Sequence, residues 1–419
     1  MRRGAKDPLR DAPAPGEAEA QRRAWRLAEA AFEQRPAPVE HTPLVRRPAF
    51  AVLATAMLLV IALTPPGSAV ADWLGDAVKS VVDPDPRAPV SGLDDLPGGG
   101  RLLVLAAPAD GGAPALWVAG DGGHEKLGAG VTEATWSPHG LFVALARGGE
   151  LIAVDPRGER RWALTAPGPV AGVRWSPDGF RIAYTTGDEQ RLVAGDGTGD
   201  RRVASAATGA APPFGAPAWR PGPGHVLAFA DTERVFLADV DARRVVWERR
   251  VAAERGAAGE RGVAGDRSGA GERAAAGEPP AAQLAFSPDG RSLLVDGRLL
   301  LDAGTGRPVA TAPETDLTGA TWHPDGRRFA VVRDAGGRAE VLLGRRSGRS
   351  IRFRRLFAAG ALRLGGFSPD GRRLLVDWPE NDSWLFLSLD GTRPRQLTGV
   401  RRRFGARDVE IQGWCCPRE

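Results

Sequence analysis

Residue types that commonly carry enzyme chemistry are scarce in this sequence. Among 419 residues there are five histidines, two cysteines and one tyrosine. The histidines are dispersed, and the sequence contains no zinc-protease motif, no nucleophile-elbow motif of serine hydrolases and no phosphate-binding loop. We therefore expect a protein that is not an enzyme, with no catalytic residues, no metal and no cofactor.

Lysine is also rare, being present only at Lys6, Lys79 and Lys126. The chain carries 56 basic and 51 acidic residues, so nearly all of its positive charge comes from arginine and the formal net charge is only +5. The arginines are scattered, and no helix-turn-helix, zinc-finger or aromatic RNA-binding motif occurs. We expect no nucleic-acid partner.

A short turn sequence, aromatic-Ser-Pro-Asp-Gly, recurs along the chain. Complete or altered copies stand at 136–140, 175–179, 219–222, 286–290, 322–326 and 367–371. Their prolines, Pro138, Pro177, Pro221, Pro288, Pro324 and Pro369, are 39, 44, 67, 36 and 45 residues apart. A period in this range indicates a repeat architecture.

The residues of this sequence suit a tight turn between two antiparallel strands. Proline presets φ for the first central residue, aspartate is favoured in turns, and glycine takes the left-handed conformation that closes a bulged hairpin. We therefore interpret Asp178, Asp289, Asp325 and Asp370 as turn residues rather than as catalytic carboxylates or calcium ligands. Further apolar runs follow each turn, so each repeat holds four strands, as in one propeller blade.

At these residues the chain resembles the TolB-type, WD-like β-propeller repeat of bacterial envelope proteins. The resemblance covers roughly residues 97–419 and implies an all-β fold. It says little about function, because propellers serve many functions. The sequence departs from the pattern at His139, at 220–222 and at His323, where we expect the turns to differ.

The two ends of the repeat region are complementary. Three expected strands, at 101–106, 115–119 and 124–127, precede the first turn, and one unpaired strand at 409–414 follows the last repeat. This pattern predicts seven blades, the first completed by the C-terminal strand so that no sheet edge stays unpaired. Six blades are the alternative.

The only cysteines, Cys415 and Cys416, are adjacent. In an oxidising compartment they could form a vicinal disulfide or an intermolecular bridge. Burial as two small thiols and metal binding are the alternatives, although no histidine or further cysteine stands nearby to complete a zinc site.

Residues 1–47 form a polar head in which 17–35 has the pattern of an amphipathic helix. Its apolar arc includes Trp25, Ala28 and Phe32. Two interpretations are open: a helix lying on the membrane surface, or a helix that docks a cytoplasmic partner.

Residues 48–71 contain no charged side chain and predict one transmembrane helix. Arg46 and Arg47 precede it, so the head should stay in the cytoplasm and the rest should be exported. The competing interpretation is a signal peptide cleaved after 69–71. We expect a spacer at 72–96, the propeller at 97–419, and a disordered insertion at about 251–280 that explains the one long proline spacing.

Together these features predict a single-pass protein of the cytoplasmic membrane whose exported propeller binds a ligand or a protein partner of the envelope. The head would pass a signal to a cytoplasmic regulator. A structural scaffold for envelope assembly is the first alternative, and a propeller hydrolase or lyase is the second.

Overall fold

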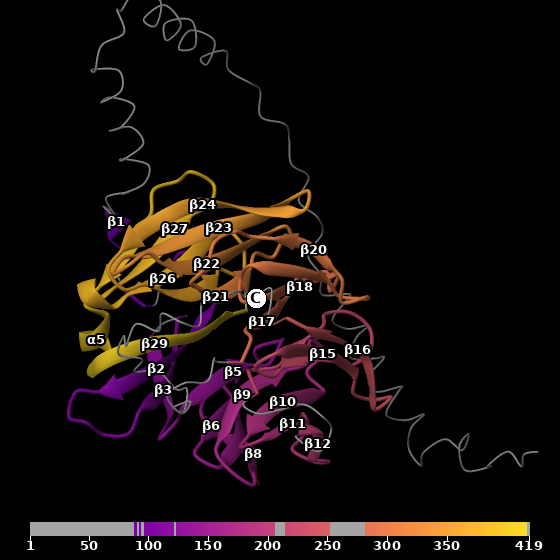
Figure 1. Ribbon diagram of the computed structural model, residues 1–419. Helices are drawn as coiled ribbons and strands as arrows, with labels where there is room; N and C mark the ends of the chain where they lie inside the picture. Colours follow the sequence, from indigo (N-terminus) through magenta and orange to yellow (C-terminus); the bar gives the residue numbers. More distant parts are fainter. Residues whose placement is uncertain are drawn as a thin grey trace, which may run out of the picture. The chain divides into compact units, whose positions relative to one another are not determined.

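Figure 1 shows the computed structural model, which describes residues 88–89, 92–93, 96–120, 123–205, 214–251 and 281–416. Within these ranges the regular structure is β-strand, apart from a 3-10 helix η3 (Pro379–Asn381) and a four-residue helix α5 (Val400–Arg403). The prediction of an all-β fold is confirmed.

Three four-stranded antiparallel sheets are each formed by consecutive strands. The first comprises β5 (Glu133–Trp136), β6 (Val143–Arg147), β7 (Glu150–Val154) and β8 (Arg160–Thr165). The second comprises β9 (Val170–Trp175), β10 (Arg181–Thr186), β11 (Glu189–Ala194) and β12 (Arg201–Ser205). The third comprises β13 (Ala218–Trp219), β14 (Val226–Ala230), β15 (Arg234–Asp239) and β16 (Arg244–Arg250).

Two further groups of four strands are joined into one eight-stranded sheet by a single parallel pairing, Thr311 with Ser350. One group comprises β17 (Leu284–Phe286), β18 (Ser292–Val295), β19 (Leu299–Asp302) and β20 (Pro308–Thr311). The other comprises β21 (Leu317–Trp322), β22 (Arg328–Asp334), β23 (Ala339–Ser347) and β24 (Ser350–Ala359).

Another sheet comprises β25 (Arg363–Phe367), β26 (Arg373–Trp378), β27 (Ser383–Ser388) and β28 (Arg395–Thr398). A two-residue strand, β1 (Ala88–Pro89), pairs with β28 in parallel. Part of the stretch expected to be a spacer therefore joins a sheet.

The last strand pairs with an early part of the chain in one sheet. The last strand, β29 (Ala406–Cys415), is antiparallel to β2 (Arg101–Pro108), which pairs in turn with β3 (Ala115–Ala119), and β3 with β4 (His124–Ala129). Figure 1 shows the yellow β29 lying along the indigo strands. The predicted pairing of the C-terminal strand with the first strands is confirmed.

One edge strand of each four-strand group, here called the inner strand, contacts the inner strand of the next group. The inner strands are β29, β5, β9, β13, β17, β21 and β25, and their contacts run in this order and return from β25 to β29. A closed cycle of four-stranded antiparallel sheets is the arrangement of a β-propeller.

The middle strands are buried on both faces, because each sheet packs between two others. Leu293 and Leu294 are adjacent on β18 and fully buried, yet they belong to two separate core clusters. Outer strands such as β8 and β16 instead alternate between exposed and partly buried residues. This difference explains why the middle strands are nearly continuous apolar runs.

Several expectations lie outside the described residues. They are the head at 1–47 with Trp25, Ala28 and Phe32, the anchor at 48–71 and nearly all of the insertion at 251–280. A search confined to the residues that the structure describes finds no helix long and apolar enough to span a membrane.

Candidate functional site

The recurring turn is held together by its own side chains, as the copy at 286–290 illustrates. Ser287 Oγ accepts a hydrogen bond from Ser292 N at 3.0 Å and donates one to Asp289 Oδ1 at 2.6 Å. Asp289 Oδ1 also accepts from Arg291 N at 3.0 Å, and Gly290 has a φ of 66°. The bond from Ser287 holds the pKa of the Asp289 carboxyl below its usual range. This carboxylate therefore has a structural partner inside its own turn.

Asp178 and Asp370 have the same arrangement with Ser176 and Ser368. Some of these prolines lie beside the glycine of the following turn: a Cβ placed on Gly179 would lie 3.8 Å from Pro138 Cδ, and one on Gly326 would lie 3.8 Å from Pro288 Cδ. Pro324 and Pro369 make similar contacts: a Cβ on Gly371 would lie 3.5 Å from Pro324 Cγ, and one on Gly100 would lie 3.0 Å from Pro369 Cγ. Pro177 lies in the turn between β9 and β10. The sequence-predicted turn residues are thus spread over successive sheets.

The turn at 322–326 uses histidine in place of serine. His323 Nδ1 accepts from Asp325 N at 3.1 Å, and His323 Nε2 lies 2.7 Å from Gly371 O in the next turn. Arg328 Nε donates to Asp325 Oδ2 at 2.8 Å. Partial burial raises the pKa of Asp325, but bonds from the Arg327 backbone and the Arg328 side chain outweigh it and lower that pKa to about 2.

The turn at 219–222 is one residue longer than the others. Trp219 pairs with Leu227, eight positions on, whereas Trp175 pairs with Ile182, seven positions on. The departure of this copy from the repeat sequence therefore has a local structural consequence.

Cys415 and Cys416 stand where the repeat would have serine and proline, and a disulfide joins them. Cys416 Sγ occupies the place that a Cβ on Gly140 would need, so the first turn packs directly on the end of the chain. Trp414 Nε1 donates to Gly99 O at 2.8 Å. The redox state in the isolated protein stays a prediction.

Towards their starts, several inner strands carry β-bulges that leave backbone N–H groups without a ladder partner. Side chains from the preceding sheet accept these bonds. Glu133 Oε2 accepts from Gly172 N at 2.6 Å, and Gln283 Oε1 accepts from Gly319 N at 3.0 Å. Gln412 Oε1 accepts from Ala134 N at 3.1 Å in the same way, although β5 is an edge strand whose pairing with β6 shows no bulge. These acceptors were missed from the sequence, although Glu133 and Gln283 each stand three residues before the aromatic residue of a turn.

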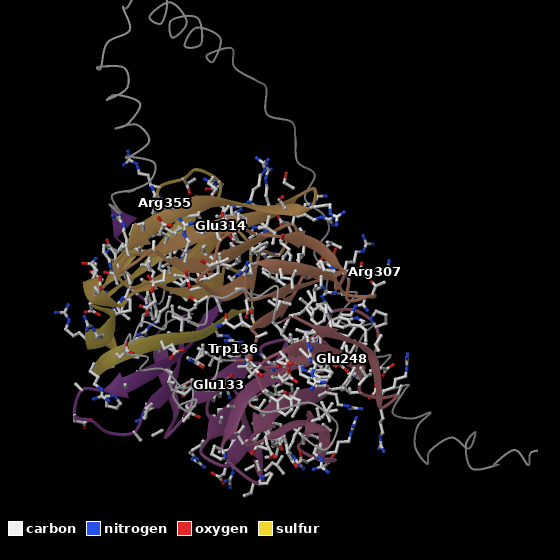
Figure 2. The ribbon with its side chains drawn as sticks, in the orientation of Figure 1. Glu133, Trp136, Glu248, Arg307, Glu314 and Arg355 are labelled. Atoms are coloured by element: carbon white, nitrogen blue, oxygen red, sulfur yellow. A yellow bond between two sulfur atoms is a disulfide. The ribbon has the colours of Figure 1, made fainter. Side chains whose placement is uncertain are left out.

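Charged side chains from four neighbouring sheets interact with one another, and we call them the central charged cluster. It consists of Glu133, Arg174, Arg363, Asp377, Asp408 and Glu410. Glu133 Oε1 accepts from Arg174 at 2.6 Å, and Arg363 lies 3.3 Å from Asp408 and 3.8 Å from Asp377. Glu133 and Trp136, labelled in Figure 2, mark the two ends of β5.

Two acids of the cluster are difficult to ionise. Asp377 is only 4% exposed, and burial raises its pKa to about 7 despite the nearby Arg363. Burial also raises the pKa of Glu410, again opposed by Arg363. With four carboxyls against two guanidinium groups, the cluster has an excess of acids. Arg363, Asp408 and Arg174 keep 37%, 31% and 42% of their side chains exposed, so solvent reaches it.

Such a cluster can bind a cation or exchange a proton. Among the residues that the structure describes, no group of three or more His, Cys, Asp or Glu side chains has the arrangement of a metal site. The sequence did not reveal the cluster, because Glu133 and Arg174 are more than 180 residues away from Arg363 and Asp408.

Comparison with known proteins yields only distant structural likeness. No family model and no curated protein matches the chain. A chain of the mitotic checkpoint complex aligns with a TM-score of 0.49 and 15% identity, covering 82% of this chain and 96% of that one. Hydrazine synthase of Kuenenia stuttgartiensis aligns with a TM-score of 0.43 and 15% identity, covering 62% of this chain and 77% of that one. TolB of Acinetobacter baumannii aligns with a TM-score of 0.38 and 13% identity, covering 62% of this chain and 67% of that one. At these values none assigns a function to this chain.

Proposed function

We propose that residues 97–419 form a seven-bladed β-propeller that acts as a binding module and not as an enzyme. The closed cycle of seven inner strands supports the blade number. The observation that carries the binding function is the central charged cluster, which holds four carboxyls and only two arginines and which solvent reaches at Arg363, Asp408 and Arg174. Propellers commonly bind partners where strands and loops of several blades converge.

The excess of acids favours a partner that presents a cationic group, such as a lysine or arginine side chain or an amine. A cation beside Asp377 and Glu410 would stabilise their ionised forms and lower both pKa values. The ion pairs with Arg363 and Arg174 hold the other two carboxylates, Asp408 and Glu133, in place. Binding should therefore weaken at high salt and at low pH.

The rest of the proposal concerns the cell. The apolar stretch 48–71 would anchor the protein in the cytoplasmic membrane with the propeller outside and the head inside. The arc of Trp25, Ala28 and Phe32 would contact a cytoplasmic regulator, so that binding outside is reported inside. Its support is the sequence pattern alone.

Crosslinking in intact cells, followed by capture of the full-length protein, tests the binding role. We expect Asp408→Asn with Glu410→Gln to lose specific envelope partners that the wild type captures. Glu150→Gln with Glu233→Gln is the control, because it removes two acids outside the cluster. If both double variants capture the same partners as the wild type, the cluster is not the binding site.

Deletion of residues 1–47 distinguishes the hypothesis of a sensor from that of a structural scaffold. A sensor should keep its envelope partners and lose its cytoplasmic one, whereas a scaffold should show no cytoplasmic partner in either form.

A further inference from the structure

Positive charge is concentrated in one sheet of the molecule. Residues 317–359, which hold β21 to β24, contain ten arginines and three acids, a net charge of +7. The whole chain has a net charge of +5, so all the other residues together carry −2. The β21–β24 group therefore provides more than the entire net positive charge of the protein.

Part of this charge has an ordinary structural explanation. Charged side chains on an outermost strand discourage edge-to-edge aggregation. Outer strands elsewhere also carry arginine pairs, such as Arg160 with Arg161 on β8 and Arg249 with Arg250 on β16. Arg352 and Arg354 on β24, and Arg355, which Figure 2 labels there, fit this explanation.

The arginines beside the start of β22 and near the end of β23 do not fit it. Arg328 on β22 is directly opposite Arg345 on β23, and Arg345 is directly opposite Arg352 on β24. Like charges in directly opposite positions destabilise a sheet. The charge of Arg328 is compensated by Asp325, whose Oδ2 lies 2.8 Å from Arg328 Nε. Within the described residues, the side chains of Arg327 and Arg345 make no hydrogen bond or ion pair.

These arginines line a cleft of about 710 Å³ between the β17–β20 and β21–β24 groups. Its apolar lining includes Leu300, Trp322 and Phe329, and its charged lining includes Arg327, Arg345 and Arg346. The one acid of the lining, Asp325, is already paired with Arg328. Trp322 Nε1 donates to Ala285 O at 3.0 Å, and Arg346 Nε donates to Gly348 O at 2.9 Å, so both groups are held in place.

We propose that this cleft binds a small phosphorylated molecule with an aromatic or apolar body. Its volume lies in the range of small-ligand pockets. The body would contact Trp322, which is partly exposed, and the phosphate would pair with Arg327 and Arg346, since a guanidinium matches a phosphate through two parallel hydrogen bonds. A dianion compensates the local charge better than a monocarboxylate. The site shares no residue with the central charged cluster, so the proposal is independent of the function proposed above.

Calorimetric titration of the full-length protein in detergent tests the proposal, with adenosine 5′-monophosphate, adenosine and inorganic pyrophosphate as probes. We expect saturable binding of the monophosphate, at least tenfold tighter than that of either other probe. Arg327→Gln with Arg346→Gln should weaken it at least tenfold. Arg349→Gln with Arg354→Gln is the matched control, because it removes the same charge from the same sheet outside the cleft.

Circular dichroism and the melting temperature will show that both double variants fold. Asp408→Asn should leave binding of the monophosphate unchanged. Three results would overturn the proposal: none of the probes binds saturably at millimolar concentration, adenosine or pyrophosphate binds as tightly as the monophosphate, or the control variant loses as much affinity as the cleft variant.

Discussion

At the scale of single residues, Asp377 makes stability depend on pH. Its carboxyl is buried, and its pKa of about 7 lies above the usual value of 3.8. The folded state therefore retains a proton that the unfolded state releases between these two values. Stability from this group is fully present below pH 3.8 and is lost as pH rises to about 7, at about 1.4 kcal/mol per pH unit.

We predict that Asp377→Asn stabilises the protein progressively, relative to the wild type, as pH rises from 5 to 7, and by a constant amount above that. Urea unfolding at pH 5, 6, 7 and 8 measures this difference. Asp289→Asn is the control: the pKa of Asp289 is lowered, so its contribution changes only below pH 4 and the difference should be flat. A flat difference for Asp377→Asn would show that the carboxyl is ionised throughout.

The serine of the turn offers a second test at this scale. Ser287 and Ser137 are both buried, at 1% and 5% exposure, but only Ser287 has an aspartate two residues later to which it donates. Position 139 is histidine in the other turn. We predict that Ser287→Ala destabilises the protein by about 1 kcal/mol more than Ser137→Ala, the usual net contribution of one hydrogen bond. The urea concentrations at which the two variants unfold measure this difference. Equal losses of stability would show that the hydrogen bond from Ser287 to Asp289 does not stabilise the turn.

At the scale of elements, β29 pairs with β2, a strand near the other end of the described residues. It pairs along the whole of β2, from Arg101 with Cys415 to Pro108 with Ala406. It also contacts the inner strands β5 and β25. Its removal would expose the edge of β2 and break the cycle of inner strands at one point.

We predict that deletion of 408–419 lowers the melting temperature strongly, by ten degrees or more, because it removes a strand and exposes an apolar edge. Deletion of 417–419 is the control, since it removes no residue of β29. Differential scanning calorimetry of the two truncated proteins compares them. Equal melting temperatures would mean that the sheet does not need its C-terminal strand.

At the scale of the whole molecule, the sequence predicts that the sheets lie outside the cytoplasmic membrane. Protease added to spheroplasts should digest residues 97–419 and leave the head at 1–47 intact. Antibodies against tags at each end would identify the protected fragment. Digestion of the head with protection of the sheets would reject this orientation, and a soluble product beginning near residue 72 would show cleavage instead of anchoring.

The sequence by itself determined the local features of this protein. Aromatic-Ser-Pro-Asp-Gly specifies a turn through bonds among its own residues, as in Ser287 with Asp289, so the turn is readable wherever it occurs. Apolar runs between turns predicted the strands, and the unmatched runs at the two ends predicted the pairing of β29 with β2. Each of these depends on neighbours in the chain or on a simple count of strands.

Only the tertiary structure decided which polar side chains meet. Glu133, Arg363 and Asp408 come together because the inner strands converge, and spacing along the chain does not encode that convergence. The bulges near Gly172 and Gly319 also make the meeting of side chains hard to predict from the sequence. Side chains alternate between the two faces of a strand, and one extra residue reverses that alternation. The arginine-lined cleft likewise lies between two four-strand groups, and their packing exists only in the folded chain.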